Sequence, residues 1–143
     1  EPEANVAAAA RYMAELQGHF SDVGDPFQRM LFALASYNGG YFHIRDAMSL
    51  ARKHGQNPHN WGVIRDYILR LSQPAYYTDP VVKYGYMRGT ETVNYVDRIR
   101  ARWGEYSGGS GFHESLRGGG MGSGSFHGAP VKSKRHYQNK YHI

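Results

Sequence analysis

Apolar residues recur at intervals of three and four positions along five stretches of this sequence, a spacing typical of one buried face of an α-helix. The five stretches cover residues 2–20, 26–38, 42–54, 60–71 and 90–103. No stretch alternates apolar and polar residues clearly enough to indicate a β-strand. With 143 residues, the chain is long enough for one domain with a single core. The sequence therefore predicts an all-α fold.

The second stretch begins and ends with distinct signals. Asp25-Pro26 is expected to supply the N-cap and the first helical residue, and the end reads "LASYNGG" over residues 34–40. One Gly or Asn in the left-handed conformation is enough to end a helix, and Gly55 is expected to do so for the third stretch. The additional glycine leaves two interpretations open. Tyr37 is either a buried ring followed by a C-cap at Asn38, or the Tyr-Asn pair is placed for contact with a ligand.

Residues 72–89, "SQPAYYTDPVVKYGYMRG", interrupt the helical pattern with two prolines, two glycines and four tyrosines. This composition predicts an ordered loop rich in aromatic rings. Its tyrosines are either anchors packed on helices or part of a glycan cleft. In the last stretch, we expect the following arginines to face water: Arg98, Arg100 and Arg102.

The net charge of +5 is concentrated at the end of the chain. Residues 107–143 hold five Lys and Arg against Glu114, and they are rich in glycine without a periodic apolar face. We therefore expect a domain over residues 1–106 and a disordered basic tail over residues 107–143. Such a tail is usually solvated, although it could also bind a polyanion. The chain has no cysteine and no apolar run of the roughly 20 residues that a membrane-spanning helix needs.

The combination of Tyr, Asn and Gly suits a sugar better than a metal or a phosphate. A tyrosine ring offers a flat apolar face, an asparagine amide both donates and accepts hydrogen bonds, and glycine lets a ligand approach the backbone. The eight histidines show no paired metal-binding spacing, and four of them lie in the tail. We therefore expect no metal and no cofactor. Glu91, at the start of the last helix, most simply complements the helix dipole.

Three blocks carry a specific resemblance: "EPEANVAAAARYMAEL", "FALASYNGGYFHIRDAMSLARKHG" and "YYTDPVVKYGYMRGTETVNYVDRI". Together, in this order, they resemble the second part of the catalytic domain of lytic transglycosylases of the goose-lysozyme-like SLT family, over residues 1–106. The family's A-x-Y-N-x-G motif is matched by Ala35 to Gly40, and its E-T-x-x-Y-V motif is matched by Glu91 to Val96.

The resemblance implies a lysozyme-like helical domain that cleaves the β-1,4 bond between N-acetylmuramic acid (MurNAc) and N-acetylglucosamine (GlcNAc) in peptidoglycan, leaving 1,6-anhydro ends. It implies that Tyr37 and Tyr95 line the glycan cleft beside the catalytic acid and that Asn38 helps to hold this region. The substrate-binding residues expected from the resemblance are Tyr37, Asn38, Gly39, Glu91 and Tyr95, with Tyr84 and Tyr86 on a loop of the cleft.

The family's catalytic Glu-Ser motif and the Gly-Leu-Met-Gln segment behind it would both precede Glu1, so we expect no catalytic residue in this chain. Glu114-Ser115 lacks that context and is interpreted as coincidence. We expect a monomer in the periplasm or cell envelope that binds peptidoglycan glycan strands and no nucleic acid. Contact with the membrane, at most the outer membrane, is expected through upstream parts alone.

Two other functions stay open at this point. The chain could be a non-catalytic peptidoglycan-binding remnant in which the cleft has lost its acid. It could also be a polyanion-binding helical protein that acts through its basic tail.

Overall fold

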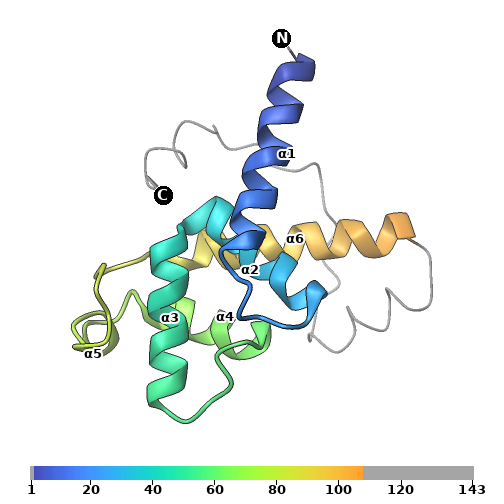
Figure 1. Ribbon diagram of the computed structural model, residues 1–143. Coiled ribbons are helices and arrows are strands. Elements are labelled where there is room, and N and C mark those ends of the chain that lie inside the picture. Colours follow the sequence, from blue (N-terminus) through green and yellow to red (C-terminus); the bar gives the residue numbers. More distant parts are fainter. Residues whose placement is uncertain (1, 108–143) are drawn as a thin grey trace.

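The computed structural model describes residues 2–107, without the side chains of residues 105–107 (Figure 1). Within this range the regular secondary structure consists of α-helices, so the all-α prediction is confirmed. The helices are α1 (Pro2–Gly18), α2 (Pro26–Gly39), α3 (Tyr41–Lys53), α4 (Trp61–Arg70), α5 (Pro74–Tyr77) and α6 (Gly89–Ser107). The predicted tail lies outside the described residues, apart from Ser107, the last residue of α6.

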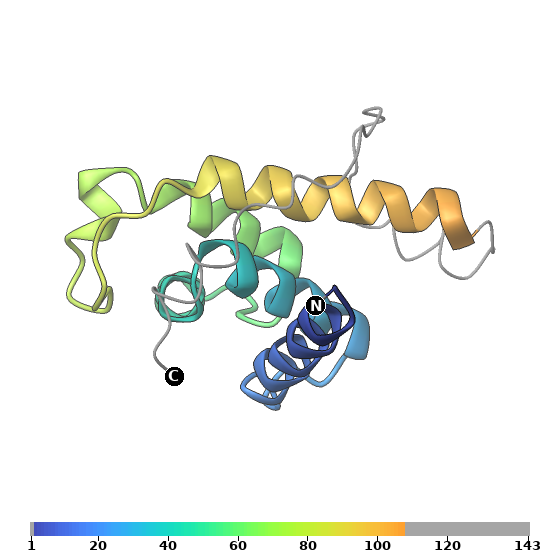
Figure 2. The same ribbon diagram turned by 90° about the horizontal axis from the view of Figure 1, so that it is seen from above.

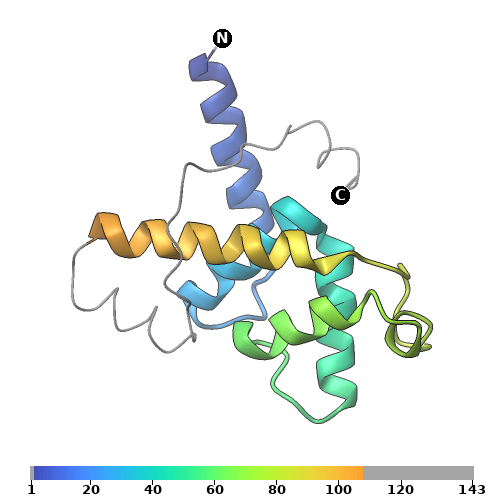
Figure 3. The same ribbon diagram turned by 180° about the vertical axis from the view of Figure 1, so that it is seen from behind.

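Helix α2 lies at the centre of the domain and contacts α1, α3, α4 and α6. Seen from above, α6 and α1 lie on opposite sides of α2 (Figure 2), and from behind, α6 runs across the domain (Figure 3). The six residues of α2 from Leu31 to Ser36 are buried, and so are Asn38 and Gly39. The apolar faces of α3 and α4 meet in the same core, because the following apolar residues of the stretches 42–54 and 60–71 are all buried: Ile44, Ala47, Met48, Ala51, Trp61, Ile64, Ile68 and Leu71.

Helix α1 joins the core through one end. Leu16 in its last turns and Phe20 just after it are buried, whereas Val6, which continues the helical spacing of apolar residues in the stretch 2–20, is 68% exposed. The first turns of α1 project away from the other helices (Figure 1). Its apolar stripe is thus covered in its C-terminal half within the described residues.

The predicted helix boundaries largely hold, because the expected capping residues make the expected contacts. Oδ1 of Asp25 accepts hydrogen bonds from the backbone N–H of Phe27 (2.8 Å) and of Gln28 (3.4 Å). Gly55 has a φ of 73° just after α3, as a C-terminal stop requires. Asn60 caps α4 by accepting a hydrogen bond from the N–H of Val63 at 3.1 Å.

Two expectations need correction. The loop over residues 72–89 contains one helical turn, α5, which begins at Pro74 because proline is favourable at the first helical position. Arg100 does not face water: it is 2% exposed, and its guanidinium lies 5.8 Å from the centre of the Phe27 ring. Burial lowers the pKa of Arg100; the charge of Asp97 raises this pKa, and the charge of Arg65 lowers it further.

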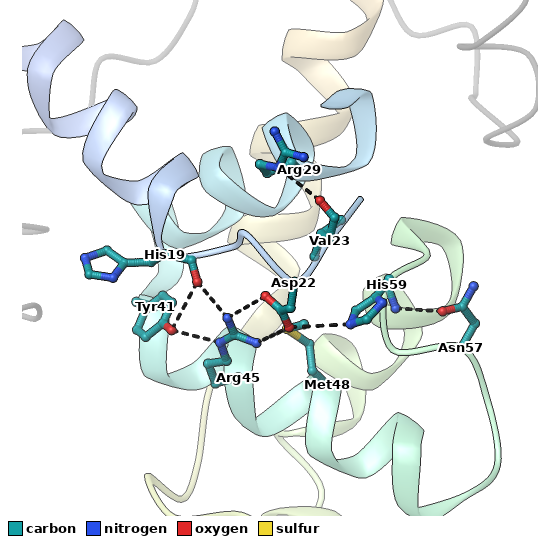
Figure 4. Close-up of polar contacts among 9 residues, drawn as sticks. All are labelled: His19, Asp22, Val23, Arg29, Tyr41, Arg45, Met48, Asn57 and His59. Atoms are coloured by element: carbon teal, nitrogen blue, oxygen red, sulfur yellow. Dashed lines mark hydrogen bonds and ion pairs between the residues drawn. The ribbon is translucent and has the colours of Figure 1, made fainter. Parts of the chain in front are cut away.

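A polar cluster fastens the connection between α1 and α2 to α3 (Figure 4). The guanidinium of Arg45 donates to both carboxylate oxygens of Asp22, at 2.8 and 2.9 Å, and to the carbonyl oxygen of His19 at 2.7 Å. Nε2 of His59, from the loop before α4, lies 3.4 Å from the Asp22 carboxylate. The Arg45 side chain also lies over the rings of Phe20 and Tyr41. This cluster joins three segments that are distant in sequence.

Candidate functional site

A polar pocket of about 260 Å³ lies where the end of α2, the start of α3 and the start of α6 meet. The loop that leads into α6 forms one of its walls. The lining residues are Asn38, Gly39, His43, Tyr86, Met87, Arg88, Glu91 and Thr92. Four residues that the sequence predicted for the site are therefore brought together: Asn38, Gly39, Tyr86 and Glu91.

A buried hydrogen bond joins the two walls of this pocket. The hydroxyl of Thr92 in α6 donates to Oδ1 of Asn38 in α2 at 2.8 Å, and both side chains are buried. Asn38 thus lies inside α2, so the interpretation that made it the C-cap is wrong. The cap is Gly40, whose N–H donates to the carbonyl oxygen of Ser36 at 2.9 Å and whose φ of 120° suits glycine.

The two consecutive glycines have separate physical reasons. Gly40 supplies the backbone conformation that ends α2 and begins α3. Gly39 has no room for a side chain, because a Cβ atom there would collide with Oγ1 of Thr92 and with Cε of Met87. Gly39 therefore allows α6 to approach α2 at the base of the pocket.

Tyr37 is half-buried and does not line this pocket. Its ring centre lies 5.7 Å from that of Tyr12 in α1, with an angle of 53° between the rings. Burial raises the pKa of the Tyr37 hydroxyl, and burial followed by the charge of Glu15 raises that of Tyr12. The structure thus places Tyr37 between α2 and α1, on a different side of α2 from the contact that Asn38 makes with Thr92.

The remaining predicted tyrosines are divided between the core and the surface. Tyr95 is 9% exposed and belongs to the hydrophobic core, so it is not among the residues that line the pocket. Tyr84 and Tyr86 are more than half exposed. The ring of Tyr84 stacks on Phe42 at 4.6 Å, and the ring of Tyr86 contacts Tyr77 edge to face at 5.7 Å.

Sequence reasoning did not predict three of the charged or polar groups around the pocket: His43, Arg88 and Thr92. Thr92 was contained in the E-T-x-x-Y-V motif, which was a usable signal, and His43 lies in the first turn of α3, four positions after Gly39. Nothing in the local sequence distinguished Arg88 from a solvated arginine. Among the residues that the structure describes, no group of three or more His, Cys, Asp or Glu side chains is arranged to hold a metal ion.

The lining of the pocket includes a carboxylate from Glu91, a guanidinium from Arg88 and an imidazole from His43. Glu91 lies in the first turn of α6, where its charge is favourable to the helix dipole, and Arg88 lies just before this helix. Such a set can exchange several hydrogen bonds with hydroxyl and amide groups of a ligand. The fold and the pocket thus define an all-α domain with a polar pocket at a junction of helices.

The chain is similar to one protein family and to several curated proteins. Residues 1–60 match the family model described as the Transglycosylase SLT domain. The chain is similar to the membrane-bound lytic murein transglycosylase F of Desulfosudis oleivorans, with 44% identity over 97 residues, which is 68% of this chain and 21% of that protein. The resemblance to lytic transglycosylase SLT domains that the motifs indicated is confirmed.

Other relatives with the same name show a similar extent of likeness. The protein of Shewanella loihica is 40% identical over 100 residues, covering 70% of this chain and 21% of that protein. The protein of Vibrio cholerae is 36% identical over 100 residues, covering 70% of this chain and 18% of that protein. The chain thus spans about a fifth of the length of the curated relatives it matches. In residues 2–107, no helix has both the length and the apolar character to cross a membrane.

Proposed function

We propose that this chain is the C-terminal part of the catalytic domain of a peptidoglycan lytic transglycosylase. The observation that supports this most is the hydrogen bond between Thr92 and Asn38, because it unites the two family motifs at one pocket. In the proposal, residues 1–106 form part of the SLT domain and residues 107–143 form a tail. The names of the relatives support an enzyme that acts on murein.

The pocket is proposed to hold part of a glycan strand. The Glu91 carboxylate can accept hydrogen bonds from sugar hydroxyls and acetamido N–H groups, the His43 imidazole can both accept and donate, and Arg88 can donate to the oxygens of the sugar. The exposed ring of Tyr86 offers an apolar face that suits the C–H surface of a pyranose. The proposal retains Tyr37 and Tyr95 near the catalytic acid of the complete enzyme, on the basis of the family resemblance.

The proposed reaction needs one carboxylic acid. It protonates the glycosidic oxygen as the bond between this oxygen and C1 of MurNAc breaks, and GlcNAc leaves with a free hydroxyl. The C6 hydroxyl of the same MurNAc then attacks C1 and gives its proton to the carboxylate. The new bond between O6 and C1 closes the 1,6-anhydro ring. Most glycosidases use two carboxylates. An internal nucleophile can replace the activated water, because effective molarities reach about 10⁵ M or more.

We assign the acid to the family's Glu-Ser motif, which is not found in its expected context among residues 1–143. Among the described residues, Glu91 is the carboxylate that lines the pocket, and its other lining residues are largely polar. A general acid needs an apolar, partly closed environment to raise its pKa. Glu91 is therefore proposed as a substrate-binding residue.

The proposal places the protein in the periplasm or cell envelope, where its partner is the glycan strand. It acts as a monomer, and any attachment to a membrane is assigned to parts of the full-length protein outside residues 1–143.

The test compares two proteins on purified sacculi. The first is the chain of residues 1–143, and the second is the longer gene product that includes the upstream Glu-Ser motif. We expect mass spectrometry to detect 1,6-anhydro muropeptides with the second protein alone, and to lose them when the glutamate of that motif is changed to Gln. A longer product that releases no anhydro ends would contradict the proposal. Activity of the first protein that disappears in Glu114→Gln would instead assign the acid to Glu114, which lies outside the described residues.

A second candidate function is binding of peptidoglycan without cleavage. For residues 1–143 without upstream parts, the polar surroundings of Glu91 favour binding over cleavage, because they do not suit a general acid. A start codon close to the codon for Glu1 would support this function, and an upstream Glu-Ser motif on an apolar helix would contradict it. The third function considered from the sequence, polyanion binding by the basic tail, concerns residues outside the described range.

A further inference from the structure

A buried carboxylate holds the loop that carries the exposed tyrosines of the site. Asp46 in α3 is 3% exposed, and its two carboxylate oxygens accept hydrogen bonds from the backbone of this loop. Oδ1 accepts from the N–H of Lys83 at 3.0 Å, and Oδ2 accepts from the N–H of Tyr84 at 2.9 Å. Hydrogen bonds to a carboxylate are stronger than neutral ones, so this pair of contacts is a firm attachment between α3 and a loop nearly 40 positions away in the sequence.

A second attachment lies three residues further along. The N–H of Met87 donates to the carbonyl oxygen of Leu71 at 3.1 Å, and the Met87 side chain is buried. Gly85 and Tyr86 are the residues between the two attachments, and Gly85 has a φ of 71°. Because both ends of this two-residue segment are held, few backbone torsion angles are free to vary. These torsion angles determine where the ring of Tyr86 lies at the wall of the pocket.

We infer that Asp46 is a positioning residue for ligand binding: it fixes the segment from Lys83 to Tyr86 so that Tyr86 is held at the wall of the pocket. The inference rests on the proposed function, because it takes the ligand to be a β-1,4-linked glycan of N-acetylated sugars. A loop that is ordered before binding loses less conformational entropy when the ligand arrives, and affinity rises accordingly.

The loop also takes part in an ion pair with α3, and this contact is more exposed than the hydrogen bonds to Asp46. Lys53 and Asp79 are 2.6 Å apart, but the Lys53 side chain is 45% exposed. Exposed pairs contribute little in water. The attachment at Asp46 is therefore the one expected to control the position of Tyr86.

The test uses Asp46→Asn in the full chain, since asparagine keeps the shape but can accept with one oxygen instead of two. We expect hydrogen exchange of the Lys83 and Tyr84 amides to become about tenfold faster, as loss of a local hydrogen bond predicts. We expect the affinity for tetra-N-acetylchitotetraose, measured by calorimetry, to fall by about three- to tenfold. Asp22→Asn, which alters a carboxylate away from the pocket, is the matched control and should bind this probe like the unaltered chain.

A double-mutant cycle of Asp46→Asn and Tyr86→Ala, measured on the affinity for the same probe, separates positioning of Tyr86 from general destabilisation. If Asp46 acts through Tyr86, Asp46→Asn causes no further loss of affinity once the Tyr86 ring has been removed. An equal loss in both backgrounds would overturn the inference, as would unchanged affinity in Asp46→Asn.

Gly85→Ala gives an independent test should Asp46→Asn fail to fold. An added Cβ atom meets no neighbour within 4 Å, so the change acts through the positive φ. It should weaken binding of the same probe by a similar factor, and unchanged affinity would overturn the inference. Absence of binding by the unaltered chain has a different meaning, because it contradicts the proposed function itself.

Discussion

The hydroxyl of Thr92 and Oδ1 of Asn38 lie 2.8 Å apart although the two residues are 54 positions apart in the sequence. Each belongs to a separate motif, one at the end of α2 and the other in the first turn of α6. Because both side chains are buried, the bond forms away from competing water. It connects helix packing to the pocket, since the two residues also line that pocket.

Thr92→Val tests this connection. Valine keeps the shape of threonine but removes the donor to a buried amide oxygen, so the free energy of unfolding should fall by about 1–3 kcal/mol. Thr92→Ser is the control: it keeps the hydroxyl and loses one methyl group, which costs about 1 kcal/mol. Urea unfolding of the three proteins provides the comparison. Equal stability of the Val variant and the unaltered chain would show that the bond contributes nothing.

Gly39→Ala should be costly even though Gly39 is helical and alanine favours helices. The added Cβ would collide with Oγ1 of Thr92 and Cε of Met87, so the buried Thr92 and Met87 side chains would have to shift. We expect a loss of about 1–3 kcal/mol, as for overpacking of a core. Gly18→Ala changes the last residue of α1, which is itself exposed and where a Cβ meets nothing within 4 Å, so it should be neutral or stabilise by up to about 1 kcal/mol. A Gly39→Ala variant that melts like Gly18→Ala would refute the close approach.

The helical elements could be predicted because their causes are local. The apolar spacing, the Asp25 cap and the Gly55 stop act within a few residues, and each is found in the structure. The single turn of α5 was missed because four residues are too few to show a period. Val6 follows the apolar stripe of α1 and is nevertheless exposed. A stripe predicts which face is available for packing, and the rest of the fold decides how much of it is covered.

The site was less predictable because its contacts are long-range. The sequence left open whether Asn38 is a local C-cap or is placed for contact with a ligand, and its partner Thr92 comes from another helix. Asp46 and Arg100 looked like ordinary charged positions on helices, and both are buried. Asp46 is buried because it binds the backbone N–H groups of Lys83 and Tyr84. Arg100 is buried because α6 packs on α2. Neither contact can be predicted from the spacing of residues along one helix.

Acid should weaken the fold through Asp22. The hydrogen bonds from Arg45, aided by its charge and opposed by burial, lower the pKa of Asp22 from 3.8 to about 2. A group whose pKa is lower in the folded state stabilises the fold above its unfolded pKa and loses this contribution as the pH falls through the folded pKa. The free energy of unfolding should therefore decline between about pH 4 and pH 2 because of this residue.

Asp22→Asn isolates this contribution. The Asp22 side chain is 39% exposed, so solvent screening reduces the expected effect to about 1 kcal/mol at neutral pH. The variant should be less stable than the unaltered chain at pH 7, and the difference should shrink towards pH 2. Chemical unfolding at several pH values measures it. A difference that stays constant over this range would show that the charge of Asp22 is not the cause.

Tyr37→Phe tests the expected role of the tyrosine in the A-x-Y-N-x-G motif. The ring contacts Tyr12 and would be kept, so removal of the half-buried hydroxyl should change the free energy of unfolding by about 1 kcal/mol or less. Since Tyr37 does not line the pocket around Asn38, the variant of the chain alone should bind tetra-N-acetylchitotetraose normally.

In the longer gene product, where the proposal puts Tyr37 beside the catalytic acid, Tyr37→Phe should lower turnover on sacculi by about tenfold, which is the effect of one lost hydrogen bond in the transition state. Tyr41→Phe is a suitable control, because its hydroxyl accepts a hydrogen bond from Arg45 in the polar cluster. If Tyr37→Phe and Tyr41→Phe leave turnover equally unchanged in the longer protein, Tyr37 has a packing role and the assignment to the cleft is wrong.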